Sequence, residues 1–393
     1  MKKNVVVLNC GSSSVKFAII DAKTGEASLT GLAENLGNAD SCMTFKTQGK
    51  KQQGDLVANA NHAQALKAIQ DVIASTGEKP VAVGHRVVHG GERFKEAALV
   101  DNSVLAAIED YASMSPLHNM ANLKGITTAQ AAYPDLPHVA VFDTSFFQQV
   151  PQRAYLYALP KKLYEEHGIR SYGFHGTSHQ FILDSSASLL NKPVSETSII
   201  SAHLGNGCSV AAIEKGIAHD TSMGFTPLEG LVMGTRCGDI DPSLPGTLQA
   251  KLGKSVSEIN DLLNKQSGLL GLSELSNDCR TLEEAAQNGH EGAKLALEVF
   301  CYRLAKYIAS YLIVVPSLDA IVFTGGIGEN SSYIRSTTMA YFAHLGFSIN
   351  NDENLAKRFG TGGNIAHECS SKPVFVVATN EEWVIAAQAL TFA

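Results

Sequence analysis

The segment Asn4–Asp21, NVVVLNCGSSSVKFAIID, indicates how the chain begins to fold. An apolar run enters a turn of glycine and serine, and a second apolar run leaves it, which predicts a β-hairpin. Ser198–Gly216, SIISAHLGNGCSVAAIEKG, repeats this plan in the second half of the chain. One supersecondary unit in each half predicts two related domains, although two hairpins can also resemble each other by chance.

The rest of the chain alternates between helical and strand patterns. Apolar residues at helical spacing predict helices over 62–73 and 295–312, and a last helix is expected at 380–390. Apolar runs predict strands at 81–88, 320–323 and 373–378, and Thr324–Asn330 is expected to be a glycine-rich loop before another helix. This alternation predicts the α/β class in both halves, with Gln148–Pro160 as the crossover between domains.

Size and composition favour a two-domain globular protein. The chain has 393 residues, more than the roughly 250–300 at which a single hydrophobic core stops growing. A net charge of −7 without a basic run argues against nucleic acid or an anionic membrane as partner. No apolar stretch approaches the ~20 residues that cross a bilayer. The seven scattered cysteines contain no C-x-x-C pair and fit neither a disulfide framework nor a zinc finger. We therefore expect a soluble cytoplasmic protein.

Three glycine-rich turns follow apolar strands and are candidates for binding phosphate. They are Asn9–Lys16, His203–Gly207 and Gly326–Asn330. Backbone N–H groups freed by glycine, hydroxyl groups and a helix N-terminus all solvate phosphate oxygens. Each turn by itself is better explained as an ordinary structural turn, but the three together favour a phosphate site. The chain has no Walker motif, and no strand leads into G-x-G-x-x-G, so a P-loop and a Rossmann site are disfavoured.

Two arginines are candidates for binding an anionic group. Arg86 lies within a predicted strand, and Arg236 lies in a loop framed by glycines. A guanidinium fork suits a carboxylate or a transferring phosphoryl group. The alternative is an arginine paired with a structural carboxylate, and Asp239 or Asp241 is available to Arg236.

Histidine pairs invite a metal-site hypothesis. His85/His89 and His175/His179 both have the H-x-x-x-H spacing that places two ligands on one helix face. However, the first pair falls on a predicted strand, and glycines around the second pair predict a loop. Zinc is therefore disfavoured, and a histidine in the second loop is better explained as a hydrogen-bond donor to an anion.

Carboxylates follow two of the predicted strands. Asp143 ends an apolar run, and Asn380, Glu381 and Glu382 follow another. Acids at the carboxyl ends of strands suit catalysis or Mg²⁺ binding. Alternatively, Asn380 caps the last helix and the two glutamates complement its dipole. Both interpretations can hold together.

The chain resembles the acetokinase family, the acetate kinases, over essentially its whole length. The motifs run in order from the first strand to the last helix: NCGSSSVKFAII, GHRVVHGGE, PLHN, FDTSF, YGFHGTSH, HLGNG, DTSMGFTPLEGLVMGTRCGDIDP, GLLGLSE, SNDCR, FTGGIGEN and TNEEW. The resemblance implies the fold of the acetate and sugar kinase, Hsc70 and actin superfamily, with two ribonuclease-H-like domains and the active site in the cleft between them. The domains would be 1–145 plus 378–393, with the C-terminal helix packed back, and 146–377, which would bind nucleotide and form a homodimer.

The resemblance also implies a reaction: reversible, Mg²⁺-dependent (or Mn²⁺-dependent) transfer of a phosphoryl group from ATP to acetate, directly and in line, giving acetyl phosphate. Because acetate is already an anion, no strong base is needed, and positioning with charge neutralisation should dominate. Propionate is the closest alternative substrate, since one methylene discriminates by only ~1–3 kcal/mol. A non-catalytic nucleotide switch of the actin and Hsc70 kind, and a sugar kinase, are alternatives from other classes.

Site residues are implied motif by motif. The catalytic set is Asp143, Arg86, Arg236 and His175, with Asp143 orienting Arg86 or Mg²⁺ rather than acting as a base. The substrate pocket is Arg86, Val88, Leu117, Phe174 and Pro227, with His118 beside it. The ATP set is Lys16, Ser12, Ser14, His203, Leu204, Gly205, Asn206, Gly207, Asp278, Cys279, Arg280, Gly326, Ile327, Gly328, Glu329 and Asn330. The metal set is Asn9 and Glu381. The chain departs from the family pattern at Met120, Phe147, Cys208 and Ser243–Gly246, none of which is an implied catalytic position.

Overall fold

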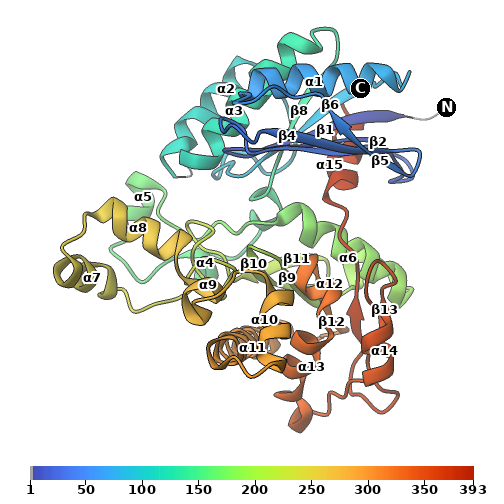
Figure 1. The fold of residues 1–393 in the computed structure, drawn as a ribbon. Coiled ribbons are helices and arrows are strands. Elements are labelled where there is room, and N and C mark those ends of the chain that lie inside the picture. The colour runs from blue at the N-terminus through green and yellow to red at the C-terminus, as the bar shows by residue number, and fades with distance from the viewer. Residues whose placement is uncertain (1–2, 115) are drawn as a thin grey trace. The chain divides into compact units, whose positions relative to one another are not determined.

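The computed structural model of the protein describes residues 3–114 and 116–393 (Figure 1). The chain divides into two compact units, each built on its own β-sheet. The first unit contains Met1–Gln148, Gly176–Ser178 and Asn380–Ala393, and the second contains Gln149–His175 and His179–Thr379. The expected α/β class is confirmed, since both units combine a sheet with helices.

The first unit contains an eight-stranded sheet in the order β5-β4-β3-β2-β1-β6-β8-β7. The predicted N-terminal hairpin is confirmed, because β1 and β2 pair antiparallel with Asn9 opposite Lys16. Strands β1, β6 and β8 are parallel, so their carboxyl ends lie at one edge of the sheet. The strands are β1 Asn4–Cys10, β2 Val15–Asp21, β3 Ala27–Glu34, β4 Cys42–Thr47, β5 Lys50–Gly54, β6 Ala82–Val87, β7 Ala98–Leu99 and β8 His138–Phe142.

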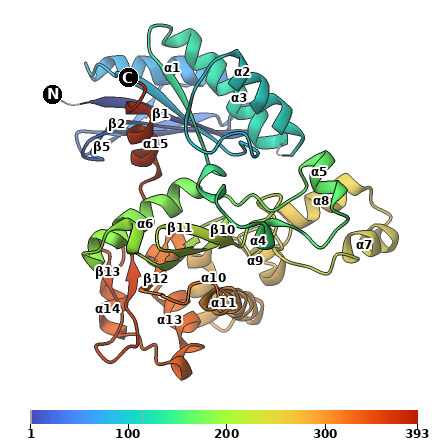
Figure 2. The same cartoon turned by 180° about the vertical axis from the view of Figure 1, so that it is seen from behind.

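Helices cover both faces of this sheet (Figures 1 and 2). They are α1 (His62–Ser75), α2 (Asn102–Asp110), α3 (Pro116–Ala132) and α15 (Glu381–Leu390). Because side chains alternate along a strand, Val6 and Leu8 of β1 pack with α1, whereas Val5 and Val7 pack with Ile385 of α15. The last helix is thereby fixed to the first unit, directly after the segment that contains Asn380.

The second unit contains a six-stranded sheet in the order β11-β10-β9-β12-β14-β13. Strands β9, β10 and β11 are antiparallel neighbours, and β12 and β14 continue parallel to β9. The succession β3-β2-β1-β6-β8 has the same order and the same strand directions in the first unit. This shared topology supports the two-related-domains hypothesis. The strands are β9 Ile199–Leu204, β10 Cys208–Glu214, β11 Ile217–Thr221, β12 Ala320–Thr324, β13 Gly363–Asn364 and β14 Val374–Val376.

The second unit contains most of the helices. Its longest, α11, confirms the predicted helix at 295–312 and begins earlier, at Glu291. The helices from the interdomain segment onward are α4 Gln152–Tyr155, α5 Lys162–His167, α6 Gly176–Leu190, α7 Leu244–Leu252, α8 Val256–Lys265, α9 Gly268–Ser273, α10 Cys279–Gln287, α11 Glu291–Leu312, α12 Gly325–Asn330, α13 Ser332–Ala340 and α14 Asn351–Ala356. Short 3₁₀ turns occur at Tyr111–Ser113, Ser145–Phe147, Val194–Glu196 and Ala343–Leu345.

Two local expectations are wrong. The glycine-rich segment 324–330 is not a loop, because Gly325–Asn330 forms the short helix α12. Gly325 has φ +77°, and a Cβ there would lie 2.7 Å from the Leu204 carbonyl oxygen, so the close approach to β9 requires glycine. His179 also lies in a helix rather than a loop, since α6 begins at Gly176 directly after His175, whose φ is +60°.

Among the described residues, no helix has both the length and the apolar character needed to cross a bilayer.

Candidate active site

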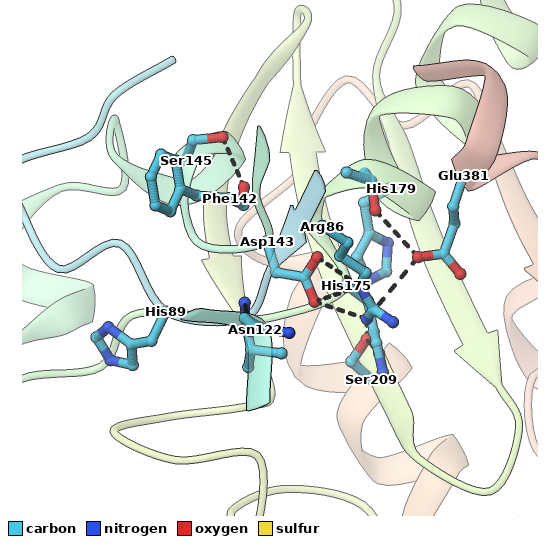
Figure 3. A network of polar contacts seen from close by, with 12 residues as sticks. Arg86, His89, Asn122, Phe142, Asp143, Ser145, His175, His179, Ser209 and Glu381 are labelled. Atoms are coloured by element: carbon cyan, nitrogen blue, oxygen red, sulfur yellow. Dashed lines mark hydrogen bonds and ion pairs between the residues drawn. The ribbon is translucent and has the colours of Figure 1, made fainter. Parts of the chain in front are cut away.

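In the first unit, Arg86 and Asp143 form a buried ion pair at the carboxyl ends of neighbouring strands. Arg86 lies on β6, and Asp143 directly follows β8. Arg86 Nε donates to Asp143 Oδ1 at 2.9 Å and to Oδ2 at 3.2 Å, and Nη2 donates to Oδ2 at 2.7 Å (Figure 3). The Asp143 side chain is only 1% exposed. Such a two-pronged contact fixes the direction of the guanidinium, which is the orienting role expected of Asp143.

Glu381 adds a second carboxylate on the other side of Arg86. Its Oε2 lies 3.9 Å from Arg86 Nη2 and accepts a hydrogen bond from Thr177 Oγ1 at 3.0 Å. Burial alone would lower the pKa of Arg86, but the charges of Asp143 and Glu381 outweigh burial and raise that pKa. Arg86 therefore carries a permanent positive charge.

The start of α15 satisfies both interpretations of the segment after β14. Asn380 Oδ1 accepts from Trp383 N at 3.0 Å and caps the helix. Glu381 and Glu382 lie in the first turn, where negative charge complements the helix dipole. Lys16, beside the turn of the first hairpin, forms an ion pair with Glu382 and has a 58% exposed side chain. The predicted phosphate lysine is therefore held beside the carboxylate segment in a position open to solvent.

The proposed metal ligands, Asn9 and Glu381, both belong to the first unit. Within residues 3–114 and 116–393, no three His, Cys, Asp or Glu side chains are grouped so as to hold a metal ion. An amide oxygen and a carboxylate are nevertheless a suitable donor set for Mg²⁺, which is commonly bound by one or two protein carboxylates together with substrate phosphates and water. The donor chemistry thus fits an ion that arrives with a nucleotide.

In the second unit, His175, His203 and Arg236 surround one glycine turn. The His175 and His203 rings stack with centroids 4.3 Å apart. A Cβ on Gly207 would lie 3.4 Å from His175 Cε1 and 3.5 Å from Arg236 Nη1. The turn, the imidazole and the guanidinium therefore enclose a common space. Three groups with N–H donors around one small space are suited to an anion.

In the part of the chain that the structure describes, Arg236 has no carboxylate partner of the kind that a structural arginine would need. Its Nη1 donates to the Pro227 carbonyl at 3.0 Å, and no ion pair of Arg236 occurs in the described parts of the chain. Asp239 instead accepts from Gly230 N at 2.8 Å, and Asp241 accepts from Ser243 N at 2.8 Å. Burial lowers the pKa of Arg236. A largely buried cation without a counter-charge favours binding of an anion from solution.

His179 was missed as a site residue by sequence reasoning. Its Nε2 lies 2.8 Å from Ser209 Oγ, and His175 Nδ1 lies 2.9 Å from the same oxygen. Its Nδ1 contacts Ser201 Oγ at 3.0 Å. Burial, and to a smaller extent His203, hold the pKa of His179 well below its usual value, so it is neutral. The two histidines of the H-x-x-x-H pair therefore contact the same serine hydroxyl.

The implied acetate pocket is described in part. Phe174 is 1% exposed and directly precedes His175, and Pro227 accepts the Arg236 hydrogen bond. Val88 belongs to the first unit, where its N–H donates to Asn122 Oδ1 at 3.1 Å. The side chains of Leu117 and His118 lie outside the described residues.

A cavity of about 570 Å³ opens in the second unit beside the His203–Gly207 turn. This volume is within the range of small-molecule sites. It brings together most of the implied ATP residues of this unit, and four further residues that sequence reasoning did not name. The implied residues in its wall are Gly205, Asn206, Asp278, Cys279, Arg280, Gly326, Ile327 and Asn330, and the further ones are Asn277, Glu283, Ser331 and Phe359.

The remaining implied ATP residues do not line this cavity. His203, Leu204 and Gly207 belong to β9 and its turn, and Ser12, Ser14 and Lys16 belong to the first unit. Gly328 and Glu329 have structural contacts: Gly328 O accepts from Arg335 Nη1 of α13 at 2.8 Å, and Glu329 Oε1 accepts from Gly325 N within α12 at 3.0 Å.

Asp278 and Arg280 form one wall of the cavity at the start of α10. Asp278 Oδ1 accepts from Arg280 N at 2.8 Å, and Arg280 Nη2 lies 2.6 Å from Asp278 Oδ2. The Arg280 hydrogen bond lowers the pKa of Asp278 to about 2. The Arg280 side chain is 87% exposed, so its guanidinium is accessible to a nucleotide.

The departures from the family pattern occupy varied environments. Phe147 is fully buried, and Met120 is 47% exposed. Cys208 is buried at the start of β10, where its Sγ donates to the Gly205 carbonyl at 3.2 Å. Ser243–Gly246 opens α7, with Ser243 as the N-cap.

Comparison with known proteins identifies the family. The model of the acetokinase family matches residues 4–387. An acetate kinase of Shewanella sp. (strain W3-18-1) is 55% identical over 99% of this chain and 98% of its own length. A propionate kinase structure from Francisella tularensis subsp. tularensis SCHU S4 is 44% identical, with a TM-score of 0.95 and 99% of both chains covered. The acetate kinase structure from Porphyromonas gingivalis is 39% identical, with a TM-score of 0.92 and 99% of both chains covered. The chain belongs to the acetokinase family, whose members are carboxylate phosphotransferases.

Proposed function

We propose that the protein transfers the γ-phosphoryl group of ATP to acetate, reversibly, giving ADP and acetyl phosphate. The observation that carries this proposal is Arg236, a largely buried guanidinium that has no carboxylate partner among the described residues and lies beside His175 and the glycine turn. The name acetate kinase, carried by the relatives from Shewanella and Porphyromonas gingivalis, supports the choice of acetate.

The chemistry requires charge neutralisation more than acid–base catalysis. A carboxylate oxygen of acetate attacks the γ-phosphorus, a new O–P bond forms, and the bond from the γ-phosphorus to the bridging oxygen breaks as ADP leaves. Both reactants are anions, so their approach must be compensated by positive charge. We propose that Arg86 and Arg236 provide this charge and that Asp143 keeps Arg86 oriented. His175, fixed by Ser209, would donate a hydrogen bond to the transferring group.

A divalent ion fits the first unit. Asn9 and Glu381 would hold Mg²⁺ or Mn²⁺, which when bound shields the phosphate charges. The nucleotide itself would occupy the cavity of the second unit, with its phosphates toward the turn at Gly205 and Asn206. Ser12, Ser14 and Lys16 remain proposed phosphate contacts.

The size of the acid is the open part of the proposal. Propionate is the second candidate, because a relative of 44% identity from Francisella tularensis is named a propionate kinase. The test is kcat/KM for acetate, propionate and butyrate, measured side by side as acid-dependent ADP release. We expect acetate to give the highest value. ADP release without any acid would favour a nucleotide switch, and release only with a hexose would favour a sugar kinase.

We further propose a cytoplasmic homodimer that associates through the 146–377 domain. All seven cysteines are free thiols, which suits a reducing compartment. Size-exclusion chromatography with light scattering tests the dimer: a mass of one chain at micromolar concentration would contradict it.

A further inference from the structure

Phe359 is an unusual residue at the rim of the nucleotide cavity. It lines the cavity, yet the residue is 79% exposed. Its backbone is also left-handed, with φ +52°. This conformation is uncommon for residues other than glycine and costs free energy for a bulky side chain. Two features of Phe359 are therefore unfavourable in the free protein, an exposed aromatic ring and a strained backbone. The burial of this residue offsets little of their free-energy cost.

Specific contacts hold Phe359 at this rim. Asn330, the last residue of α12, accepts from Phe359 N through Oδ1 at 2.9 Å and donates from Nδ2 to the Gly326 carbonyl at 2.9 Å. The fully buried Arg335 donates to Gly328 O at 2.8 Å and to Lys357 O at 3.4 Å. The segment before Phe359 and helix α12 therefore share two anchors. These contacts fix the position of the Phe359 segment relative to α12.

The direction of α12 shows which end of a nucleotide meets Phe359. The helix begins at Gly325, against the Leu204 carbonyl at the base of the phosphate turn. It ends at Asn330, which holds Phe359. Six residues at 1.5 Å per residue separate the two ends by about 8 Å. A nucleotide whose phosphates occupy the turn therefore extends its base toward Phe359.

We propose that Phe359 binds the adenine base of ATP by stacking on it, and that Ile327 of α12 supplies apolar contact in the same part of the cavity. The inference rests on the proposed ATP site and adds a specificity-determining residue to it. Aromatic rings stack on bases because every base offers a π-face. The Arg358 guanidinium, 5.3 Å from the centroid of the Phe359 ring, adds positive charge on this side of the cavity.

The test compares Phe359→Ala, the conservative Phe359→Tyr, and Ile313→Ala as a matched control. Ile313 is an 86% exposed apolar side chain in the same unit and outside the cavity. We expect Phe359→Ala to raise KM and Kd for ATP about 5- to 100-fold with kcat at saturating ATP nearly unchanged. Phe359→Tyr should keep the affinity for ATP within about 3-fold of wild type. Ile313→Ala should change neither KM nor Kd for ATP.

Inorganic tripolyphosphate separates stacking from a structural effect. It has no base, so its inhibition constant should be the same for wild type and Phe359→Ala. An equal loss for ATP and tripolyphosphate would overturn the stacking role. If wild type and Phe359→Ala bind ATP equally well, the stacking inference is refuted and the proposed function is not. Wild type that binds no ATP would refute the proposed function itself.

Discussion

Arg236→Ala should abolish most of the activity and leave the fold nearly intact. The side chain donates to the Pro227 carbonyl at 3.0 Å and to Met233 Sδ at the long distance of 3.9 Å, and it forms no ion pair in the described residues. Losing such a bond costs about 1 kcal/mol, and removing an uncompensated buried charge offsets part of that cost. Losing a charged donor in the transition state costs ~3 kcal/mol or more, so kcat should fall at least about 100-fold.

Arg86→Ala is the contrasting variant, because it removes one member of an ion pair and leaves the other, Asp143, in place. Asp143 is 1% exposed, and without the guanidinium this buried carboxylate loses the cation with which it forms an ion pair. Breaking a buried pair in this way costs roughly 3–5 kcal/mol of folding free energy. Arg86→Ala should therefore lose both activity and stability, whereas Arg236→Ala should lose activity alone.

The assays are urea unfolding, read as the midpoint and slope, and acetate-dependent ADP release at saturating substrates. Arg236→Lys is a useful control, since it keeps the charge but not the planar fork and should recover only part of kcat. The reasoning would be refuted by near wild-type kcat in Arg236→Ala, or by a loss of stability in Arg236→Ala as large as that in Arg86→Ala.

Three further predictions follow from the geometry. Gly207→Ala should keep Tm within a few degrees, because its Cβ would lie at ordinary contact distances, 3.4 Å from His175 and 3.5 Å from Arg236. It should lower kcat, because this Cβ would occupy the space assigned to the anion. A wild-type kcat would contradict this prediction. Burial raises the pKa of Asp220 to about 6 from 3.8, so the stability it contributes is complete below pH 4 and is lost as pH rises through 6. In urea titrations, the free energy of unfolding of Asp220→Asn should rise relative to that of wild type by up to about 3 kcal/mol between pH 4 and 7. A difference in unfolding free energy that does not change with pH would contradict this prediction. Lys16→Ala should change unfolding by less than about 1 kcal/mol, since the exposed ion pair is worth little, but should raise KM for ATP; an unchanged KM would remove Lys16 from the phosphate site.

The sequence predicts the architecture well where periodicity and turns are local. The hairpin Asn4–Asp21 and its counterpart at 198–216 both exist, because apolar runs around a glycine turn leave few other ways to bury their side chains. Apart from the family resemblance, the common strand order of the two sheets was visible in the sequence only as the likeness between these two hairpins.

The contacts that define the site depend on residues far apart in the chain. No local pattern shows that Arg236 lacks a carboxylate, since Asp239 and Asp241 are near in sequence but are engaged elsewhere. Ser209 likewise joins His175 and His179 through the packing of α6 against the sheet.

Phe359 gave no signal at all in the sequence. Its role depends on a left-handed backbone and on Asn330, both consequences of tertiary structure.

The most direct test of the account is the product itself. Purified protein is incubated with acetate, ATP and Mg²⁺ in hydroxylamine, which traps acyl phosphate as a coloured hydroxamate. We predict hydroxamate in amounts equal to the ADP released, dependent on acetate and lost in Arg236→Ala. ADP release without hydroxamate, or no reaction with any short carboxylate, would contradict the claim that two arginines allow two anions to react.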